Sequence, residues 1–261
     1  MARLCPLFSG SKGNSYYIGS KKAGILVDAG RSAKQIEMML KACDIEISAI
    51  QGICVTHEHT DHISGVRVFA KKHAVPVFAS KGTMRAMAGA MMGEVAVSEM
   101  EDELQIADMT ISPFHTSHDC AEPLGYRIKT KDERVITVAT DLGFLSEEVK
   151  EALSGVDFAV IESNHDVEML RHGPYPYYLQ KRILSERGHL SNETCADFLP
   201  YMAKNGTTRF LLAHLSQENN SRSLALETAM ARLLNAGFIS GEDFILDAAR
   251  VENVSGNTIL F

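Results

Sequence analysis

The sequence of 261 residues contains 45% hydrophobic and 23% charged residues, so it can bury a full core within one domain spanning residues 1–261. Its formal net charge of −7 excludes an overall basic surface, so any site for a polyanion must be local. The sequence has no N-terminal signal segment, no apolar run of membrane length and no paired cysteine motif, which predicts a cytoplasmic protein without a membrane segment.

The first part of the chain alternates short apolar runs, typical of strands, with stretches whose apolar residues recur at helical spacing. We predict strands at residues 4–8, 16–18, 24–27, 50–55 and 75–79. We predict helices at residues 63–72 and 82–91. A further helix follows Ser32, its expected N-cap, with Ile36, Met39 and Leu40 on the apolar face.

The second part of the chain continues this alternation. The stretch from residue 92 through 117 is predicted to be mostly strands, followed by strands at 126–129, 135–139, 158–162, 210–213 and 244–246. Helices are predicted at 146–153, 191–204 and 221–235. This order predicts an α/β architecture in which two sheets pack face to face with helices outside.

Three imidazoles and the carboxylate of Asp61 lie close together within residues 56–62, directly after the apolar run 53–55. His57 and His59 are expected to point to the same side, because side chains alternate with period two along an extended segment. Asp61 and His62 follow at the turn into the next helix. These side chains are all ligands for divalent metals, and they are too many for one tetrahedral ion.

Acids and imidazoles recur where the predicted strands end. Asp28, Asp141 and His214 each follow an apolar strand, and His115 and His118 come after the run 110–114. Taken singly, a strand-end aspartate is more often a turn residue, and a lone histidine is more often a surface or core residue. As a series that converges on one rim, these residues predict a dinuclear metal site.

The ordered set of His57, His59, Asp61, His62, His118, Asp141 and His214 resembles the signature of the metallo-β-lactamase superfamily. The segments Ser-Gly-Ser-Lys-Gly-Asn-Ser at 9–15, Glu-Ser-Asn-His at 162–165 and Gly-His-Leu-Ser-Asn at 188–192 narrow the resemblance to the YycJ/WalJ family of bacterial hydrolases. That family is related to ribonuclease Z and to PhnP-type phosphodiesterases. The resemblance implies an αββα sandwich, with two mixed sheets packed face to face and helices outside, and 5′→3′ exonuclease action on DNA.

The resemblance also implies which side chains bind metal. The first ion would be held by His57, His59 and His118, the second by Asp61, His62 and His214, and both by Asp141. His115 competes with His118 for its position, and Asp28 is expected to orient a ligand histidine or the loop rather than to touch metal. These nitrogen and oxygen ligands admit two divalent ions, zinc or manganese, with iron as a further option.

A pair of divalent ions can share one water and deliver hydroxide at neutral pH for in-line attack on a phosphodiester. The leaving alkoxide then needs a proton. His189 is the predicted donor, because it lies outside the ligand set in a loop that opens a helix. Glu162 would keep this imidazole cationic, and the alternative for His189 is a local hydrogen bond at the helix start. The predicted catalytic residues are Asp61, Glu162 and His189.

The segment 171–189 has a local surplus of three positive charges with tyrosines interleaved. Lys181 and Arg182 are predicted to neutralise phosphates of a nucleic acid, and the tyrosines to stack on bases. The alternative is a solvated helix whose tyrosines pack on the body of the protein. Ser191 and Asn192 are further predicted substrate contacts, and capping of the next helix is the alternative for Ser191.

The function predicted from these residues is that of a dinuclear metal-dependent phosphodiesterase, a DNA exonuclease. One alternative is a thioester or lactam hydrolase of the glyoxalase II type on the same fold, which leaves Glu162, His189 and the basic segment without a use. A second alternative is a non-catalytic, metal-bearing regulator, which does not need a complete ligand set.

Overall fold

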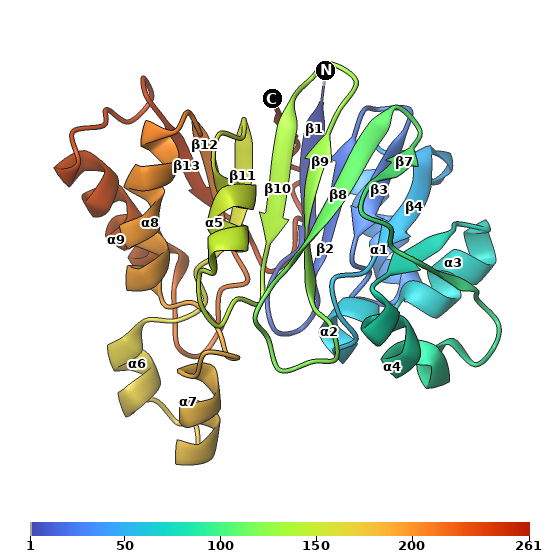
Figure 1. Cartoon of the computed structure of the whole chain (residues 1–261), viewed down its shortest axis with the longest axis horizontal. Helices are drawn as coiled ribbons and strands as arrows, with labels where there is room; N and C mark the ends of the chain where they lie inside the picture. Colours follow the sequence, from blue (N-terminus) through green and yellow to red (C-terminus); the bar gives the residue numbers. More distant parts are fainter. Residues whose placement is uncertain (1) are drawn as a thin grey trace. The chain divides into compact units, whose positions relative to one another are not determined.

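Two mixed sheets of seven strands each form the framework of the computed structural model, which describes residues 2–261 (Figure 1). The strand order is β14-β1-β2-β3-β4-β5-β6 in one sheet and β13-β12-β11-β10-β9-β8-β7 in the other. This framework confirms the predicted α/β class with two mixed sheets. Two compact units can be described: the first contains residues 2–113, Cys120–Arg134 and Arg250–Phe261, and the second contains Phe114–Asp119 and Val135–Ala249. The single domain expected for residues 1–261 stays a prediction.

The first unit begins with antiparallel strands and continues with parallel ones. Strands β1 (Arg3–Phe8), β2 (Ser15–Gly19) and β3 (Gly24–Val27) pair antiparallel, and β14 (Ile259–Leu260) pairs with β1 in the same sense. Strands β4 (Ile50–Cys54), β5 (Val77–Ala79) and β6 (Val97–Glu99) then add in parallel to β3. The remaining strands that begin in this unit are β7 (Leu104–Ile106), β8 (Met109–His115) and β9 (Leu124–Lys129).

The helices of the first unit pack their apolar faces on its sheet. They are α1 (Ala33–Ala42), α2 (Thr60–Ile63), α3 (Val66–His73) and α4 (Lys81–Met91), with a short 3₁₀ helix at Ile47–Ala49. Ser32 caps α1 as predicted, because its hydroxyl accepts the Gln35 N–H. Ile36, Met39 and Leu40 of α1 are buried in one core cluster with residues of the strands, so the predicted apolar face is confirmed.

The second unit is built on parallel strands. Strands β10 (Val135–Ala139), β11 (Phe158–Glu162), β12 (Arg209–Ala213) and β13 (Ile245–Ala248) run in one direction. Helices α5 (Glu147–Leu153), α8 (Asn192–Lys204) and α9 (Arg222–Asn235) bury their apolar residues against β11 and β12 in a second core cluster (Figure 1). Helices α6 (Val167–His172) and α7 (Tyr177–Ile183) complete this unit.

The helix predicted at 63–72 is interrupted in the structure, where α2 ends at Ile63 and α3 starts at Val66. Gly65, between them, donates its N–H to the Ala29 carbonyl at 2.8 Å. A Cβ atom at Gly65 would lie 2.0 Å from the Arg31 carbonyl oxygen, so the backbone approaches closely there. Helices α6 and α7 and strand β14 were not predicted. Within residues 2–261, no helix is both long and apolar enough to cross a membrane.

Candidate metal centre

The parallel strands of the second unit bring acids and imidazoles to one edge. In the register of the sheet, Ala139 of β10 is paired with Ile161 of β11, and Glu162 of β11 is paired with Ala213 of β12. Asp141 and His214 therefore follow neighbouring strands at the same end as Glu162. Carboxylate and imidazole atoms of Asp141, Glu162, His189 and His214 lie within 4.8 Å of one another, close enough to share a metal ion.

Three of the strand-end residues have a left-handed backbone. The φ angles are 62° at Asp28, 58° at Asp141 and 55° at His214. Aspartate, asparagine and histidine tolerate this region better than most residues, although each instance still costs about 1–2 kcal/mol. Such strain typically occurs at functional sites, where the surrounding structure holds it in place. In this protein the left-handed backbone turns the chain sharply at each of these three residues, where the strand before it has ended.

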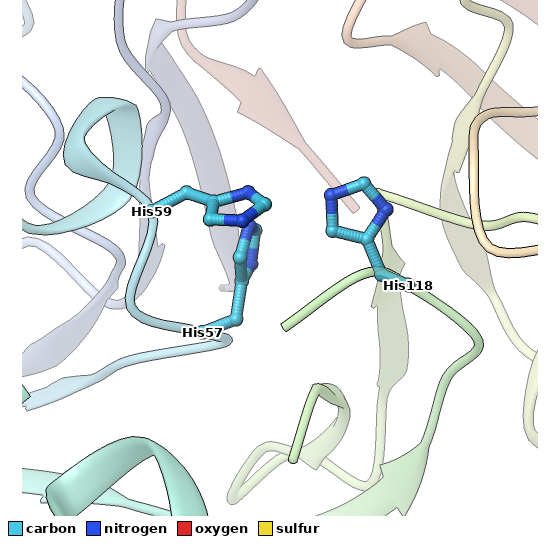
Figure 2. Close-up of side chains that lie close together, drawn as sticks. All are labelled: His57, His59 and His118. Carbon is cyan, nitrogen blue, oxygen red and sulfur yellow. The ribbon is translucent and has the colours of Figure 1, made fainter. Parts of the chain in front are cut away.

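His57, His59 and His62 of the first unit lie in a compact group after β4. The rings of His57 and His59 meet edge to face with their centroids 4.6 Å apart, and Figure 2 shows both rings rising from the same loop. Figure 2 also draws His118, which belongs to the second unit. The ring of His62 lies 4.0 Å from that of His57, measured between centroids. Asp61 and His62 lie in α2, in place of the turn that the sequence predicted.

Asp28 orients this histidine group, as the sequence predicted. Its carboxylate lies 2.7 Å from Nδ1 of His62 and accepts the Thr56 N–H and hydroxyl, each at 2.8 Å. Because the Thr56 hydroxyl donates to Asp28, it can accept from Nδ1 of His57, which is 3.0 Å away. Burial raises the pKa of Asp28, and the contacts with His62 and Thr56 act in the opposite direction. One buried carboxylate thus sets the orientation of two imidazoles.

Asn14 also belongs to this group, and sequence reasoning missed it. Its amide Nδ2 lies 3.0 Å from Nε2 of His62 and 3.3 Å from the Asp61 carboxylate. Its Oδ1 accepts the N–H of Gly10 at 2.9 Å, and its own N–H donates to the Asp61 carbonyl. The 9–15 loop therefore uses these N–H groups inside the protein. The sequence signal that could have identified Asn14 was its position within the motif at residues 9–15.

Glu162 is the centre of the corresponding network in the second unit. Its Oε1 lies 2.9 Å from Nδ1 of His189 and 2.8 Å from Nδ1 of His214. Its Oε2 accepts the N–H groups of Leu142 at 2.7 Å and Leu190 at 3.1 Å. The contact between Glu162 and His189 that the sequence predicted is therefore present, and the glutamate also holds His214.

The carboxylate of Glu162 is ionised in this network although it is fully buried. Burial by itself would raise its pKa, but the imidazoles of His189 and His214 outweigh burial and hold the pKa below its ordinary value. An ionised carboxylate can only accept hydrogen bonds, so Nδ1 of each histidine carries a hydrogen. In the neutral form of each ring, the lone pair is then on the other nitrogen, Nε2.

His118 has the surroundings of a ligand, and His115 does not. Nδ1 of the buried His118 donates to the Gly188 carbonyl at 3.0 Å. His115, at the end of β8, is exposed, and both its N–H and its Nδ1 contact the Glu148 carboxylate. The geometry therefore favours His118 of the two candidates that the sequence offered.

A common pattern links the buried histidines of both units. In four of the five buried histidines that the structure describes, Nδ1 contacts an oxygen: Thr56 for His57, Asp28 for His62, Gly188 for His118 and Glu162 for His214. The fifth, His165, has no hydrogen-bond partner at Nδ1. Histidines that bind metal through Nε2 usually have their Nδ1 hydrogen held by such an oxygen. Together with the carboxylates of Asp61 and Asp141, this donor set fits divalent cations.

The four predicted substrate contacts fall into two places. Lys181 and Arg182 lie on the exposed side of α7. Ser191 caps α8 by accepting the Thr194 N–H at 3.1 Å, which is the alternative that the sequence left open. Asn192 is buried, and its amide exchanges hydrogen bonds with Ser163 and Asn220. Direct contact of these residues with a substrate stays a prediction, and the last two have structural contacts in the fold.

Comparison with known proteins adds to this geometry. A profile described as "Beta-lactamase superfamily domain" matches residues 24–215. "Exodeoxyribonuclease YycJ" of Bacillus anthracis is 39% identical over 243 residues, which cover 91% of this chain and 91% of that protein. "Exodeoxyribonuclease WalJ" of Streptococcus pneumoniae serotype 2 is 39% identical over 244 residues, which cover 91% of this chain and 90% of that protein.

Solved structures are similar at the level of the fold. The metallo-beta-lactamase fold protein YhfI from Bacillus subtilis aligns with a TM-score of 0.69 and 14% identity, over 99% of this chain and 98% of that chain. At this identity the likeness concerns the arrangement of the chain alone. It confirms the α/β sandwich that the sequence predicted.

Proposed function

The chain belongs to the beta-lactamase superfamily, with exodeoxyribonucleases of the YycJ/WalJ type among its relatives, and from this we propose that it is a metal-dependent phosphodiesterase that degrades DNA in the 5′→3′ direction. The similarity to these relatives extends over nine-tenths of both proteins, so it includes more than the metal-binding motif. The chain is a hydrolase by family, and DNA is its proposed substrate. We also propose that it acts in the cytoplasm, in keeping with the buried thiols of Cys5, Cys43, Cys54 and Cys195.

The proposed centre holds two divalent cations, zinc or manganese. Its ligands are His57, His59 and His118 for one ion, Asp61, His62 and His214 for the other, and Asp141 for both. This assignment joins side chains of the two units and follows the family's motif. The Nδ1 contacts of His57, His62, His118 and His214 support it, because they fix the ring tautomer that metal binding through Nε2 requires.

When bound, a pair of divalent cations lowers the pKa of water to about 7 and offsets the negative charge of a phosphodiester. The protein's own groups must then orient the scissile phosphate and supply a proton to the leaving oxygen. We assign the proton to His189, whose side chain is part-exposed, with 17% of its surface accessible. A general acid in this position typically contributes about 10²–10⁴-fold to the rate.

The network around Glu162 is the observation that supports this proposal most strongly. One buried, ionised carboxylate contacts Nδ1 of the proposed acid, His189, and Nδ1 of the proposed ligand, His214. Its negative charge stabilises the cationic form of His189, from which a proton can leave through Nε2. By accepting from Nδ1 of His214, the same carboxylate selects the neutral tautomer whose Nε2 has the lone pair that a metal ligand needs. A thioester hydrolase has no need for such a coupled acid, because a thiolate can leave without a proton.

A nuclease assay with matched variants tests the proposal. The unaltered protein, loaded with zinc or manganese, should shorten a 5′-labelled DNA strand from that end. His189→Ala should keep its metal content but slow cleavage by about 10²–10⁴-fold. His172→Ala, which removes an exposed histidine of α6, should cleave at the unaltered rate.

The outcomes separate the alternative functions. A metal-loaded protein that hydrolyses thioesters or lactams but leaves DNA intact contradicts the proposal. A protein that binds metal but cleaves neither DNA nor thioesters nor lactams also contradicts the proposal. Full DNA cleavage by the His189→Ala variant removes His189 from the mechanism.

A further inference from the structure

Helix α7 exposes an aromatic and basic face. At 100° per residue, Tyr177, Tyr178, Lys181 and Arg182 fall within an arc of about 140°. The two tyrosines are each 73% exposed, an unusual exposure for large side chains that are mostly apolar. Ile183, on the opposite side of the helix, is buried and holds α7 on the second unit. We refer to Tyr177, Tyr178, Lys181 and Arg182 as the α7 face.

Contacts within the second unit hold the α7 face in place. The ammonium of Lys181 lies 5.6 Å from the ring centre of Tyr177, within the range of a cation–π contact. Arg182 makes a two-point ion pair with Asp119, with Nη2 to Oδ1 at 2.9 Å. At the start of the helix, the Gln180 amide donates to the Tyr175 carbonyl at 2.9 Å. The face is therefore ordered before any partner binds, which lowers the entropic cost of binding.

The α7 face is connected to the candidate metal centre through the His118 loop. Asp119, which binds Arg182, follows His118 directly in the chain. The Arg187 guanidinium donates to the His118 carbonyl, with Nη2 at 3.2 Å, and the Gly188 carbonyl accepts from the His118 ring. A ligand lying on α7 would thus continue towards the two loops that carry His118 and His189, whose ring centroids lie 4.9 Å apart.

We propose that the α7 face binds a single-stranded segment of the DNA substrate, with bases stacked on Tyr177 and Tyr178 and a phosphate next to Lys181. This inference rests on the proposed function and adds to it the form of the substrate. Stacking on an aromatic ring requires unpaired bases, because a base within a duplex is covered on both faces. The face therefore selects a frayed or single-stranded end.

Charge complementarity supports a nucleic acid as the occupant. The chain has a formal net charge of −7, whereas residues 171–189 contain four cationic side chains, Arg171, Lys181, Arg182 and Arg187, against one carboxylate, Glu186. Asp119 offsets the charge of Arg182, and Glu168 lies 3.6 Å from Arg171, so Lys181 is the cation of the α7 face that attracts a polyanion locally. Interleaved tyrosines and cations are the combination that single-strand binding surfaces use. An interface with another protein does not need this charge contrast.

Binding of a phosphorothioate-linked oligothymidylate, which resists hydrolysis, tests the inference in the metal-loaded, full-length protein. The double variant Tyr177→Ala with Tyr178→Ala should weaken binding by at least about tenfold, because each of the two lost base stacks accounts for roughly fivefold or more. Lys181→Gln should reduce the slope of log Kd against log salt concentration by about 0.7, the effect of one phosphate contact with a single strand.

Tyr201→Ala is the matched control. Tyr201 is also exposed, at 53%, stacks on Phe198 of α8 and does not belong to residues 171–189. Its replacement should leave binding of the oligonucleotide unchanged. The inference is overturned if the double variant binds as tightly as the unaltered protein, or if Tyr201→Ala weakens binding as much as the double variant does.

A substrate without bases separates this inference from the proposed function. Bis(p-nitrophenyl) phosphate reports phosphodiester hydrolysis without stacking. If the α7 face binds DNA, the double variant should lower the ratio of activity on single-stranded DNA to activity on this compound by about tenfold or more. An equal fall in both activities contradicts the inference. No hydrolysis of either substrate by the unaltered protein contradicts the proposed function instead.

Discussion

Replacement of Glu162 by glutamine is the most informative single change in this protein. The substitution keeps the size of the side chain, removes its charge and turns one acceptor oxygen into a donor. In the native network both oxygens only accept: Oε2 from the N–H groups of Leu142 and Leu190, and Oε1 from the imidazoles of His189 and His214. A glutamine amide cannot satisfy all four donors in either orientation.

The structure sets the size of the effect. If the amide nitrogen faces Leu142 and Leu190, two buried N–H groups lose their acceptor, at about 1–3 kcal/mol each, or about 2–6 kcal/mol together. If it faces the imidazoles, Nδ1 of His214 must accept, and its hydrogen moves to Nε2, the proposed ligand atom. Loss of such a supporting contact typically lowers metal affinity by about 10–100-fold. The first orientation lowers Tm by at least about 4 °C, since 1 kcal/mol corresponds to roughly 2–4 °C in a protein of this size.

Two measurements check this prediction: zinc affinity by competition with a chelator, and Tm of the metal-free protein. Glu148→Gln is the matched control, because Glu148 also contacts a histidine, His115, but at an exposed position. The control should leave both quantities within experimental error of the unaltered protein. Unchanged zinc affinity together with unchanged Tm in Glu162→Gln would refute the reasoning.

Three further outcomes follow from the same geometry. The pKa of Glu162 is held below its ordinary value of 4.5, so the stability that its charge contributes is present above about pH 4.5 and is lost as the pH falls from there towards the lower pKa of the folded state. The difference in Tm between unaltered and Glu162→Gln protein should therefore narrow below about pH 4.5, and a difference that widens there contradicts the assignment. Asp28→Asn, which tolerates the left-handed φ of 62°, should lower metal affinity by about 10–100-fold because the carboxylate that holds His62 is gone; equal affinity by titration would leave Asp28 without that function. His118→Ala should lose bound metal by elemental analysis and His115→Ala should not; the reverse result would exchange their assignments.

Candidate site residues could be selected from the sequence because many of them follow buried strands. Apolar runs identify those strands, and the polar residue that ends each one is visible without a structure. Asp28, Asp141 and His214 were found in this way. The contact between Asp28 and a ligand histidine was also predicted, since a carboxylate often orients such a ring.

Features that depend on contacts between distant parts of the chain could not be predicted from the sequence. The break between α2 and α3 results from the close approach of Gly65 to the backbone of residues 29–31, which lies more than thirty positions earlier. Helices α6 and α7 are short, and the segment between them contains Pro174 and Pro176, which suggested a loop. The contact of Asn14 with His62 joins two loops that no local pattern relates.

The central claim is that one hydrolytic centre takes metal ligands from both parts of the chain. Elemental analysis combined with DNA cleavage tests it directly on the unaltered protein, on His59→Ala and on His214→Ala. We expect two equivalents of metal and active cleavage in the unaltered protein, and fewer equivalents with loss of cleavage in each variant. Full metal content and full cleavage in either variant would contradict the claim.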